Sequence, residues 1–214
     1  MFLAFLILQA ATSKAEDLQT DLMETSWYLP LELNDRNTSI SFEIDSTWHL
    51  IHGKTSGIRG RVWLEEPNDP KSIHGDVSIP VSLFDTDNSS RDERLREVMN
   101  AKKFGDVTFS INLVEKLCLP QSLIPNEGCS GSATGSLSIG GHEEVVPLIF
   151  LVTRTLNGFT IVGTAVFSWR IFPIEDPSIL VAQLDDDVKV SFTVDTTARS
   201  ATSDATAEKQ DSLP

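Results

Sequence analysis

The sequence predicts an all-β protein, built as an antiparallel sandwich or a closed barrel, with one amphipathic α-helix. Three observations support this prediction. Apolar and polar residues alternate in about eight or nine short runs, a pattern typical of strands with one buried face. Only one stretch has a helical pattern, and helices do not alternate with strands as they do in parallel α/β folds. Barrel closure would also remove the sheet edges that such a protein would otherwise expose.

The helical pattern lies between Asp85 and Phe109, where it interrupts two strand-like runs. Short polar side chains at residues 85–89 can accept hydrogen bonds from the free amides of a helix start. Leu95, Val98 and Met99 then form a narrow apolar stripe at helical spacing, and charged residues fill the opposite face. We expect this helix to cover the sheet. The simpler alternative is a helix whose charged face is only solvated.

Three strands are expected before this helix, at residues 39–48, 55–64 and 77–83. Each has apolar residues at every second position. The loop at 65–72, which contains two prolines and an Asn-Asp pair, separates the second strand from the third. Pro80 lies within the third run, and proline cannot donate a ladder hydrogen bond. It therefore predicts an edge strand or a bulge.

Five further strands are expected after the helix, and two of them form a clear hairpin. Gly140-Gly141 separates the runs that end at Ile139 and resume at Val145, which is a strong hairpin signal. A turn-rich link at 170–178 precedes the last strand. The predicted strands are residues 107–113, 137–139, 145–152, 161–169 and 188–194.

The two ends of the chain are expected to lie outside the domain. Residues 1–15 are an apolar run that ends in a small-x-small site, so we predict a secretory signal peptide cut after Ala15. An apolar N-terminus on a cytosolic protein is the alternative. Residues 16–30 are predicted to be a leader on the domain surface, and 197–214 a disordered acidic tail. A periplasmic or secreted location follows from the signal peptide.

Cys118 and Cys129 are the two cysteines of the chain. In an exported protein they are most simply a disulfide that closes one hairpin excursion, which would contribute about 3 kcal/mol in the chain-entropy model. Two free buried thiols are the alternative. The net charge of −14 disfavours a nucleic-acid partner and adsorption to an anionic membrane. The apolar run at the N-terminus is too short for stable membrane insertion.

The sequence has no convincing catalytic or metal-binding set. His49 and His52 point to opposite faces of a strand at their spacing, so they do not suggest a metal pair. The run Asp185–Asp187 is more typical of a solvated turn than of a calcium site. Nucleophile-elbow and phosphate-loop motifs do not occur. We therefore expect a protein that is not an enzyme and has no resident cofactor or metal.

The chain resembles the YceI-like proteins, a lipocalin-like group with polyisoprenoid-binding members. The most specific part is Arg91-Asp92 with Leu95-Arg96 at a helix start, shortly before a Phe and a Thr-Phe strand. The resemblance extends from about Leu31 to Val194, and we assign residues 31–196 to the domain. The residues that support it are Ser39–Ile44, His52 with Gly60, Thr86–Asn88, Arg91-Asp92, Leu95-Arg96, Phe104, Val107–Phe109, Gly135–Gly141 and Val188–Val194.

The resemblance implies an extended antiparallel eight-stranded lipocalin-like barrel whose interior binds a long isoprenoid, such as a quinone tail or a polyprenyl lipid. His52, Arg91 and Asp92 are candidates for holding a polar head group or closing the mouth, and for Arg91 and Asp92 a structural pair that anchors the helix is favoured. Ordinary core packing is the alternative for each apolar candidate. The apolar residues expected to line the interior are Phe42, Ile44, Ile79, Val81, Phe109, Ile111, Leu137, Ile139, Phe167, Trp169, Val190 and Phe192.

Two other functions remain open. One is a structural or interaction module with a filled core that acts through its loops. The other is an enzyme acting on a small apolar or quinone substrate. A cavity of hundreds of cubic ångströms would favour the carrier or the enzyme over the module. A buried, partnered ionisable group facing that cavity would favour the enzyme. The oligomeric state is also open, with a homodimer as one option.

Overall fold

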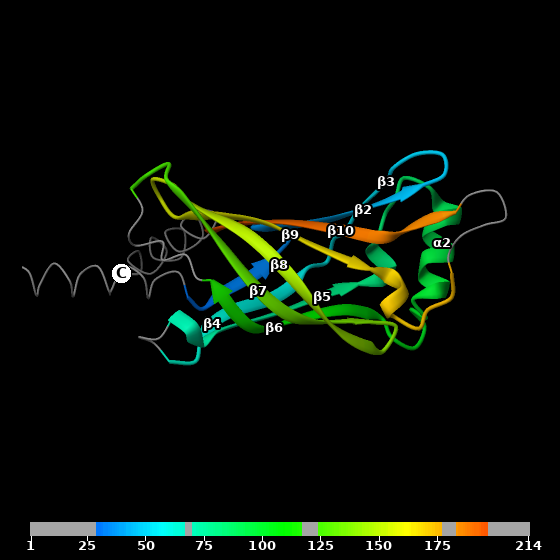
Figure 1. Ribbon diagram of the computed structural model, residues 1–214, viewed down its shortest axis with the longest axis horizontal. Helices are drawn as coiled ribbons and strands as arrows, with labels where there is room; N and C mark the ends of the chain where they lie inside the picture. The colour runs from blue at the N-terminus through cyan, green and yellow to red at the C-terminus, as the bar shows by residue number, and fades with distance from the viewer. Residues whose placement is uncertain (1–28, 67–69, 117–123, 177–182, 197–214) are drawn as a thin grey trace, which may run out of the picture.

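The computed structural model describes residues 29–66, 70–116, 124–176 and 183–196, where ten strands form one curled sheet with a helix at one end (Figure 1). The strands and the helix are β1 (Leu31–Asn34), β2 (Thr38–Ser46), β3 (Ile51–Lys54), β4 (Arg59–Leu64), β5 (Ile73–Pro80), α2 (Ser89–Val98), β6 (Asp106–Lys116), β7 (Gly128–Ile139), β8 (His142–Arg154), β9 (Phe159–Ser168) and β10 (Leu184–Asp195). Three short 3₁₀ turns are η1 (Pro70–Ser72), η2 (Val81–Leu83) and η4 (Trp169–Ile171).

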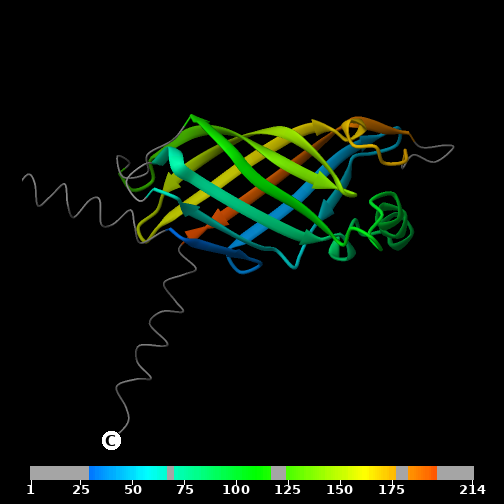
Figure 2. The same ribbon diagram turned by 90° about the horizontal axis from the view of Figure 1, so that it is seen from below.

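The sheet is antiparallel throughout, in the order β1-β4-β5-β6-β7-β8-β9-β10-β2-β3. It curls into an extended half-barrel whose strands cross the long axis obliquely (Figure 2). The predicted all-β, lipocalin-like fold with one helix is confirmed. The prediction missed β1 and β3, because each has only four residues and so shows too little alternation to be recognised.

Hydrogen bonds continue two strand pairs beyond the ends of the edge strands β1 and β3. Asp35, in the turn after β1, accepts hydrogen bonds from the backbone N–H groups of Gly57 and Ile58, each at 2.9 Å. Thr55 N–H donates to the Ile40 carbonyl at 3.2 Å. The first two bonds continue the β1–β4 pair and the third continues the β2–β3 pair, so these backbone donors are satisfied.

Helix α2 begins and packs as the sequence predicts. Asn88 is the N-cap, and its side-chain oxygen accepts a hydrogen bond from Arg91 N–H at 3.1 Å. Val98 is buried, and Leu95 and Met99 pack against the main core cluster. Figure 1 shows α2 across one end of the half-barrel. The helix therefore covers that end of the sheet.

Two of the predicted turns can be compared directly. The β7–β8 hairpin turns at Gly140 and Gly141, with φ of +60° and +82°, as predicted. Pro80 does not lie on an edge strand, because β5 pairs with β4 on one side and β6 on the other. It is instead the last residue of β5, after which the chain turns through η2. Proline has no N–H to donate to a strand ladder, and this matters least at the last residue of a strand. The position of Pro80 therefore explains why a central strand tolerates a proline.

Several predictions about the chain ends fall outside the described residues. These are the signal peptide at 1–15, nearly all of the leader at 16–30, the tail at 197–214, and Cys118. Cys129 lies in β7, so its pairing with Cys118 stays a prediction. No helix in the described ranges is long and apolar enough to span a lipid bilayer.

Candidate functional site: an apolar cavity along the barrel

The half-barrel encloses a cavity of about 900 Å³. Its lining extends from residues of α2, such as Ser90 and Leu95, to residues of the β8–β9 turn, such as Thr155 and Leu156. The lining residues of β8 run from Val146 to Arg154, a rise of about 26 Å at 3.3 Å per residue, so the cavity is elongated. A volume of this order lies at the upper end of the range for small-molecule sites.

The wall is built from the inward-facing residues of consecutive strands. On β10, for example, Val188, Val190, Phe192 and Val194 all line the cavity at every second position. Eleven of the twelve apolar residues predicted to line the interior do so. They are Phe42, Ile44, Ile79, Phe109, Ile111, Leu137, Ile139, Phe167, Trp169, Val190 and Phe192. Their contact with a ligand stays a prediction.

Val81 and His52 are not on the cavity wall. Val81 is 1% exposed and packs within the main core cluster, because Pro80 ends β5 and the η2 turn takes the next side chains out of the strand alternation. His52 lies on β3, where Ile51 and Gly53 are buried and its own side chain is 67% exposed. It points outward and pairs with Glu43 at 3.1 Å. His49 lines the cavity instead.

Several inward phenylalanines lie over a glycine of the adjacent strand. Phe42 faces Gly53 across the β2–β3 pair, and a Cβ built on Gly53 would lie 2.1 Å from the tip of the Phe42 ring. Phe192 and Gly163 show the same arrangement between β10 and β9, with a corresponding distance of 2.3 Å. Each ring therefore lies along the wall rather than across the lumen. The glycines provide the space that keeps the cavity open.

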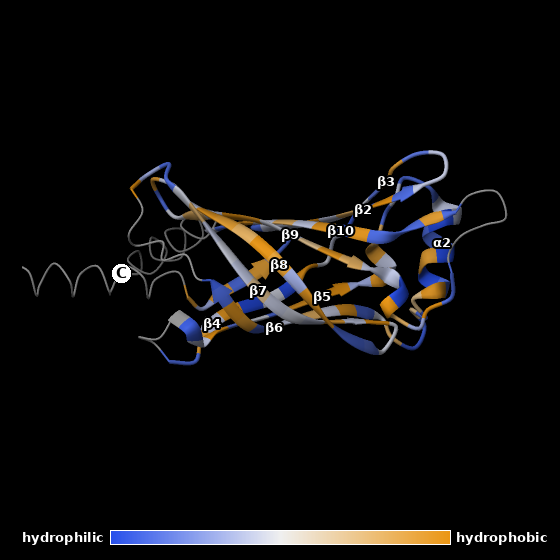
Figure 3. Ribbon diagram, viewed as in Figure 1, coloured by the Kyte–Doolittle hydropathy of each residue, from blue (hydrophilic) through white to orange (hydrophobic). Residues whose placement is uncertain are grey.

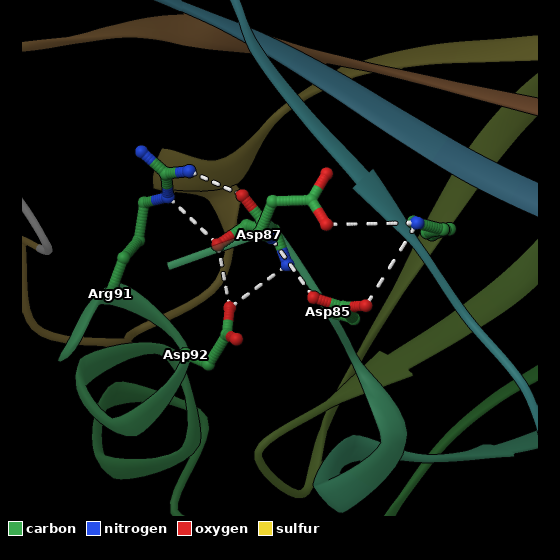
Figure 4. A network of polar contacts seen from close by, with 6 residues as sticks. Asp85, Asp87, Arg91 and Asp92 are labelled. Carbon is green, nitrogen blue, oxygen red and sulfur yellow. Dashed lines mark hydrogen bonds and ion pairs between the residues drawn. The ribbon is translucent and has the colours of Figure 1, made fainter. Parts of the chain in front are cut away.

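At the α2 end, Thr86 is the centre of a buried polar network (Figure 4). Its N–H and hydroxyl both donate to Asp92 Oδ1, at 3.0 and 2.6 Å. Arg91 Nε donates to the Thr86 hydroxyl at 2.8 Å, and Arg91 Nη2 donates to the Thr86 carbonyl at 2.5 Å. Thr86 and Asp92 are 4% and 9% exposed. The Arg91-Asp92 pair thus fastens the first turn of α2 to the segment that leaves η2.

The two members of this pair differ in their relation to the cavity. Asp92 does not line it, whereas Arg91 does. The Nη1 atom of Arg91 has no partner within the described part of the chain. The ionisable side chains among the described lining residues are His49, Arg91, Arg94 and Arg154. All four are basic types, although the whole chain has a net charge of −14.

At the opposite end of the cavity, the notable polar atom is the hydroxyl oxygen of Thr155. Within the described residues, Thr155 Oγ1 is the buried side-chain oxygen or nitrogen that lacks a hydrogen-bond partner. Thr155 lines the cavity beside Arg154 and Leu156, in the turn between β8 and β9. A buried hydroxyl without a partner is costly, so this position suits a water molecule or a polar atom of a ligand.

The resolved pKa shifts belong to exposed groups outside the cavity. A hydrogen bond and the positive charge of Lys189 lower the pKa of Glu43, with a smaller effect from His52. Asp186 and Asp176 raise the pKa of Arg170. In the described ranges, no group of three or more His, Cys, Asp or Glu side chains is placed to hold a metal ion.

Sequence reasoning missed part of the lining. The missed positions extend the predicted inward faces, as Leu148 and Val152 do on β8, or lie on unpredicted strands, as Leu31 and Leu33 do on β1. Leu29, within the predicted surface leader, also lines the cavity. Counting the period-two pattern out to the strand ends would have found the first group. The polar position at Thr155 gave no sequence signal.

Comparison with known proteins identifies the fold. A family model described as the YceI-like domain matches residues 31–196. A search of curated proteins gives no significant match.

Among solved structures, this chain is similar to BcnA of Burkholderia cenocepacia, with 19% identity and a TM-score of 0.58 over 73% of this chain and 94% of that one. A polyisoprenoid binding domain from Saccharophagus degradans has 12% identity and a TM-score of 0.58, covering 77% and 97%. A YCEI protein of Campylobacter jejuni has 21% identity and a TM-score of 0.51, covering 66% and 81%.

Proposed function

The chain belongs to the YceI-like family, and from this premise we propose that it binds and carries a long apolar isoprenoid lipid, of polyprenyl or quinone type, inside the barrel without catalysing a reaction. One observation supports the proposal most strongly. The cavity of about 900 Å³ is lined mainly by apolar side chains, and its described ionisable lining residues are few and basic. The Saccharophagus degradans domain with the same fold is described as polyisoprenoid binding.

The energetics suit a chain-like ligand. Each methylene removed from water contributes about 0.8 kcal/mol, so a long hydrocarbon tail needs no directional contacts to bind tightly. The rings of Phe42 and Phe192 lie along the wall, so they add apolar contact without crossing the lumen. An elongated lumen favours a slender chain over a compact ligand of equal volume.

The α2 end is the better place for a polar head group. Among the described residues, the Nη1 atom of Arg91 has no hydrogen-bond partner there, and Arg94, His49 and Ser90 line the same end. These side chains can donate hydrogen bonds to oxygen atoms, and arginine binds phosphate and carbonyl oxygens well. We therefore expect a head group with acceptor oxygens, such as a quinone ring or a phosphate.

The two alternatives have less support. A filled-core interaction module does not account for a large lined cavity. An enzyme would be favoured by a buried acid or base, with its partner, facing the cavity. The buried carboxylate at the α2 end, Asp92, is bonded to Thr86 and does not line the cavity. Among the described lining residues there is no Asp or Glu to pair with the four basic side chains.

The cellular location also belongs to this proposal. The signal peptide predicted at residues 1–15 and the disulfide predicted between Cys118 and Cys129 both favour a periplasmic or secreted carrier. An apolar isoprenoid has little solubility in water, so a carrier between membranes would have a clear use for an enclosed apolar cavity.

Native mass spectrometry of the protein purified from its own host, followed by solvent extraction, tests the proposal. A co-purifying mass that matches a quinone or polyprenyl lipid is the expected result. Protein that is empty and also fails to take up added quinone and polyprenyl phosphate would overturn it. Equal binding of straight-chain fatty acids and isoprenoids of similar length would overturn the isoprenoid class while leaving a general lipid site.

A matched pair of variants links binding to the lumen. Ala165→Phe adds a ring to the cavity wall on β9 and should lower affinity for the lipid at least about tenfold, because the ring occupies the volume of several methylenes. Ser41→Phe adds the same ring to an exposed position on β2 and should leave affinity unchanged. Circular dichroism checks that both variants fold. Equal affinity for both would show that the lipid does not occupy the lumen.

A further inference from the structure

The cavity reaches the surface at both ends of the half-barrel. A residue that is exposed and also lines the cavity marks each opening. At the end opposite α2 this residue is Leu156, which is 85% exposed in the turn between β8 and β9. At the α2 end it is Trp48, which is 69% exposed in the loop between β2 and β3. We call the opening beside Leu156 the far opening.

Two turns with exposed apolar residues project at the far opening. The β8–β9 turn is closed by a hydrogen bond from Thr155 N–H to the Gly158 carbonyl at 2.9 Å. The turn before β7 is closed by a hydrogen bond from Glu127 N–H to the Ile124 carbonyl at 3.0 Å. Ile124 is 69% exposed. Figure 3 shows hydrophobic segments in these turns and in the ribbon of β8 that leads to them.

These turns lie side by side, and apolar residues are unusual in them. Asn126 N–H donates to the Arg154 carbonyl at 2.8 Å, and Arg154 N–H donates to the Glu127 carbonyl at 3.0 Å. Turns are usually built from Gly, Pro, Asn, Asp or Ser, because these residues favour the turn backbone. Leu156 and Ile124 instead expose apolar area to water. Two such residues on adjacent turns, beside an apolar opening, indicate a contact surface rather than scattered exposure.

The size and shape of this contact surface favour a lipid bilayer over a protein. Two side chains on narrow turns provide far less than the about 800 Å² that each partner buries in a standard protein interface. A fluid bilayer can close around a small projecting tip. Leu156 lies two residues beyond Arg154, so at about 3.3 Å per residue it reaches up to about 7 Å further. Interfacial apolar residues are buried to about 5–10 Å, which places Arg154 at the level of the lipid phosphates.

Charge restricts the kind of bilayer. The net charge of −14 repels an anionic lipid surface. Within the two turns the one ionisable residue is Glu127, whose carboxylate accepts a hydrogen bond from Ile124 N–H at 3.1 Å. Arg154 adds one positive charge at the rim, where it lines the cavity. The turns and Arg154 are therefore neutral in sum, which suits a zwitterionic lipid.

The opening at the α2 end is less suited to this contact. Trp48 is exposed there, but its loop is bonded to the segment that precedes three carboxylates. Thr47 N–H donates to the Gln183 carbonyl at 3.0 Å, and Asp185–Asp187 begin two residues later. Arg170 pairs with one of these carboxylates. Lipid phosphates at this opening would meet like charges.

The arginines of the α2 end are already held by other groups. Arg91 is half-buried in its network with Thr86. Arg94 pairs with Glu97 at 3.4 Å and with Glu175 at 3.3 Å. These arginines line the cavity, so they serve a ligand inside it better than a membrane surface outside it.

We propose that the chain docks reversibly on a zwitterionic lipid bilayer through Leu156 and Ile124, with the far opening against the membrane. Docking itself does not depend on the cargo. The direction of transfer that it implies rests on the proposed function. With the head group at the α2 end, the tail faces the far opening and passes between cavity and bilayer without crossing water.

Flotation with phosphatidylcholine vesicles, using protein purified from its host, tests the docking. The native chain should float with the vesicles. Leu156→Asp and Ile124→Asp should each lower the partition coefficient at least about tenfold, because a carboxylate replaces an apolar tip. Leu113→Asp is the matched control, since Leu113 is 57% exposed on β6, pairs with Thr134 in the middle of β7 and does not line the cavity. It should partition as the native chain does.

Circular dichroism checks that every variant folds. A native chain that stays unbound at about 1 mM lipid would overturn the proposal, and so would binding that both turn variants retain. Loss of binding in Trp48→Asp alone would place the contact at the α2 end, and an equal loss in Leu113→Asp would place it on the side of the sheet. Loss of self-association in the turn variants, with unchanged vesicle binding, would assign the turns to a second copy.

Lipid transfer separates this inference from the proposed function. Docking predicts that the rate of transfer from donor to acceptor vesicles rises with the concentration of acceptor vesicles. Ile124→Asp should lower this rate without lowering equilibrium uptake of a short-tailed, water-soluble quinone, because Ile124 does not line the cavity. Uptake without docking would overturn this inference and leave the carrier function. Docking without uptake would support the membrane contact and overturn the carrier function.

Discussion

The wall of the cavity and its mouth beside α2 are built from contrasting chemistry. Along the wall, apolar packing fixes the side chains. The Phe42 ring fits over Gly53, and the Phe192 ring fits over Gly163, without a polar contact. At the mouth, directional hydrogen bonds fix the side chains, because four such bonds join Thr86, Arg91 and Asp92. A wall held by shape can accommodate chains that slide along it, whereas a mouth held by directed bonds keeps its donors in fixed positions.

This contrast suits a ligand with two unlike parts. An apolar tail binds to an even apolar surface through dispersion and burial. These interactions do not fix the position of the tail along the wall. A head group needs donors that do not move when it binds, and a guanidinium already bonded through Nε and Nη2 has lost most of its freedom. The far end of the cavity, at Thr155, is intermediate, since it has a polar atom but no network.

The largest expected effect on stability is at Gly53, where a substitution tests the packing of the Phe42 ring against the cavity wall. Gly53→Ala places a methyl group where the Phe42 ring lies, and the three nearest atoms to that position all belong to this ring. The ring must therefore turn into the lumen. We expect a loss of about 1–3 kcal/mol in the free energy of unfolding, measured with urea, and weaker lipid uptake.

The double variant Gly53→Ala with Phe42→Leu provides the control for this prediction. The shorter side chain no longer meets the added methyl group, so the two substitutions should couple favourably in a double-mutant cycle. Additive effects on unfolding would contradict the fit between ring and glycine.

An effect of similar or smaller size is expected at the mouth. Asp92→Ala removes the acceptor of both the Thr86 N–H and the Thr86 hydroxyl, which would then be buried without that partner. We expect a loss of about 1–3 kcal/mol in unfolding free energy. The exposed neighbour Glu93→Ala on α2 is the matched control and should change stability by less than about 0.5 kcal/mol. Equal, small effects of both would show that the network does not anchor the helix.

The smallest effect is expected at the far end. Thr155→Val keeps the shape of the side chain and removes a buried hydroxyl that has no partner in the described structure. The lipid-free protein should gain up to about 1 kcal/mol in thermal unfolding experiments. A clear loss of stability in lipid-free protein would indicate that the hydroxyl bonds to an internal water. A loss of lipid affinity alone would locate a polar atom of the ligand at this end.

The period-two pattern was enough to predict much of the wall, because alternation along a strand sets which side chains share a face. It correctly grouped residues as far apart in sequence as Phe42 and Phe192 on the inside. It failed at Val81, where Pro80 ends the strand and the chain turns. It also failed at His52, because the four-residue strand β3 gave no face to which this side chain could be assigned.

The cap and stripe of α2 could also be read from sequence, since Asn88 and the spacing of Leu95, Val98 and Met99 act within a few residues of each other. The partner of Asp92 could not. The carboxylate of Asp92 could have pointed to solvent, and only the path of the chain after η2 brings Thr86 to it. Thr86 lies only six residues before Asp92, but the helical spacing pattern does not determine the path of the chain before the N-cap.

The sequence by itself therefore determined the class of fold, the strand faces, the α2 helix and the apolar character of the interior, because each depends on neighbours in the chain. Tertiary structure alone decided the registers that set Gly53 against Phe42 and Gly163 against Phe192. These features depend on which strands lie side by side, and curling of the sheet fixes that pairing only when the whole domain folds.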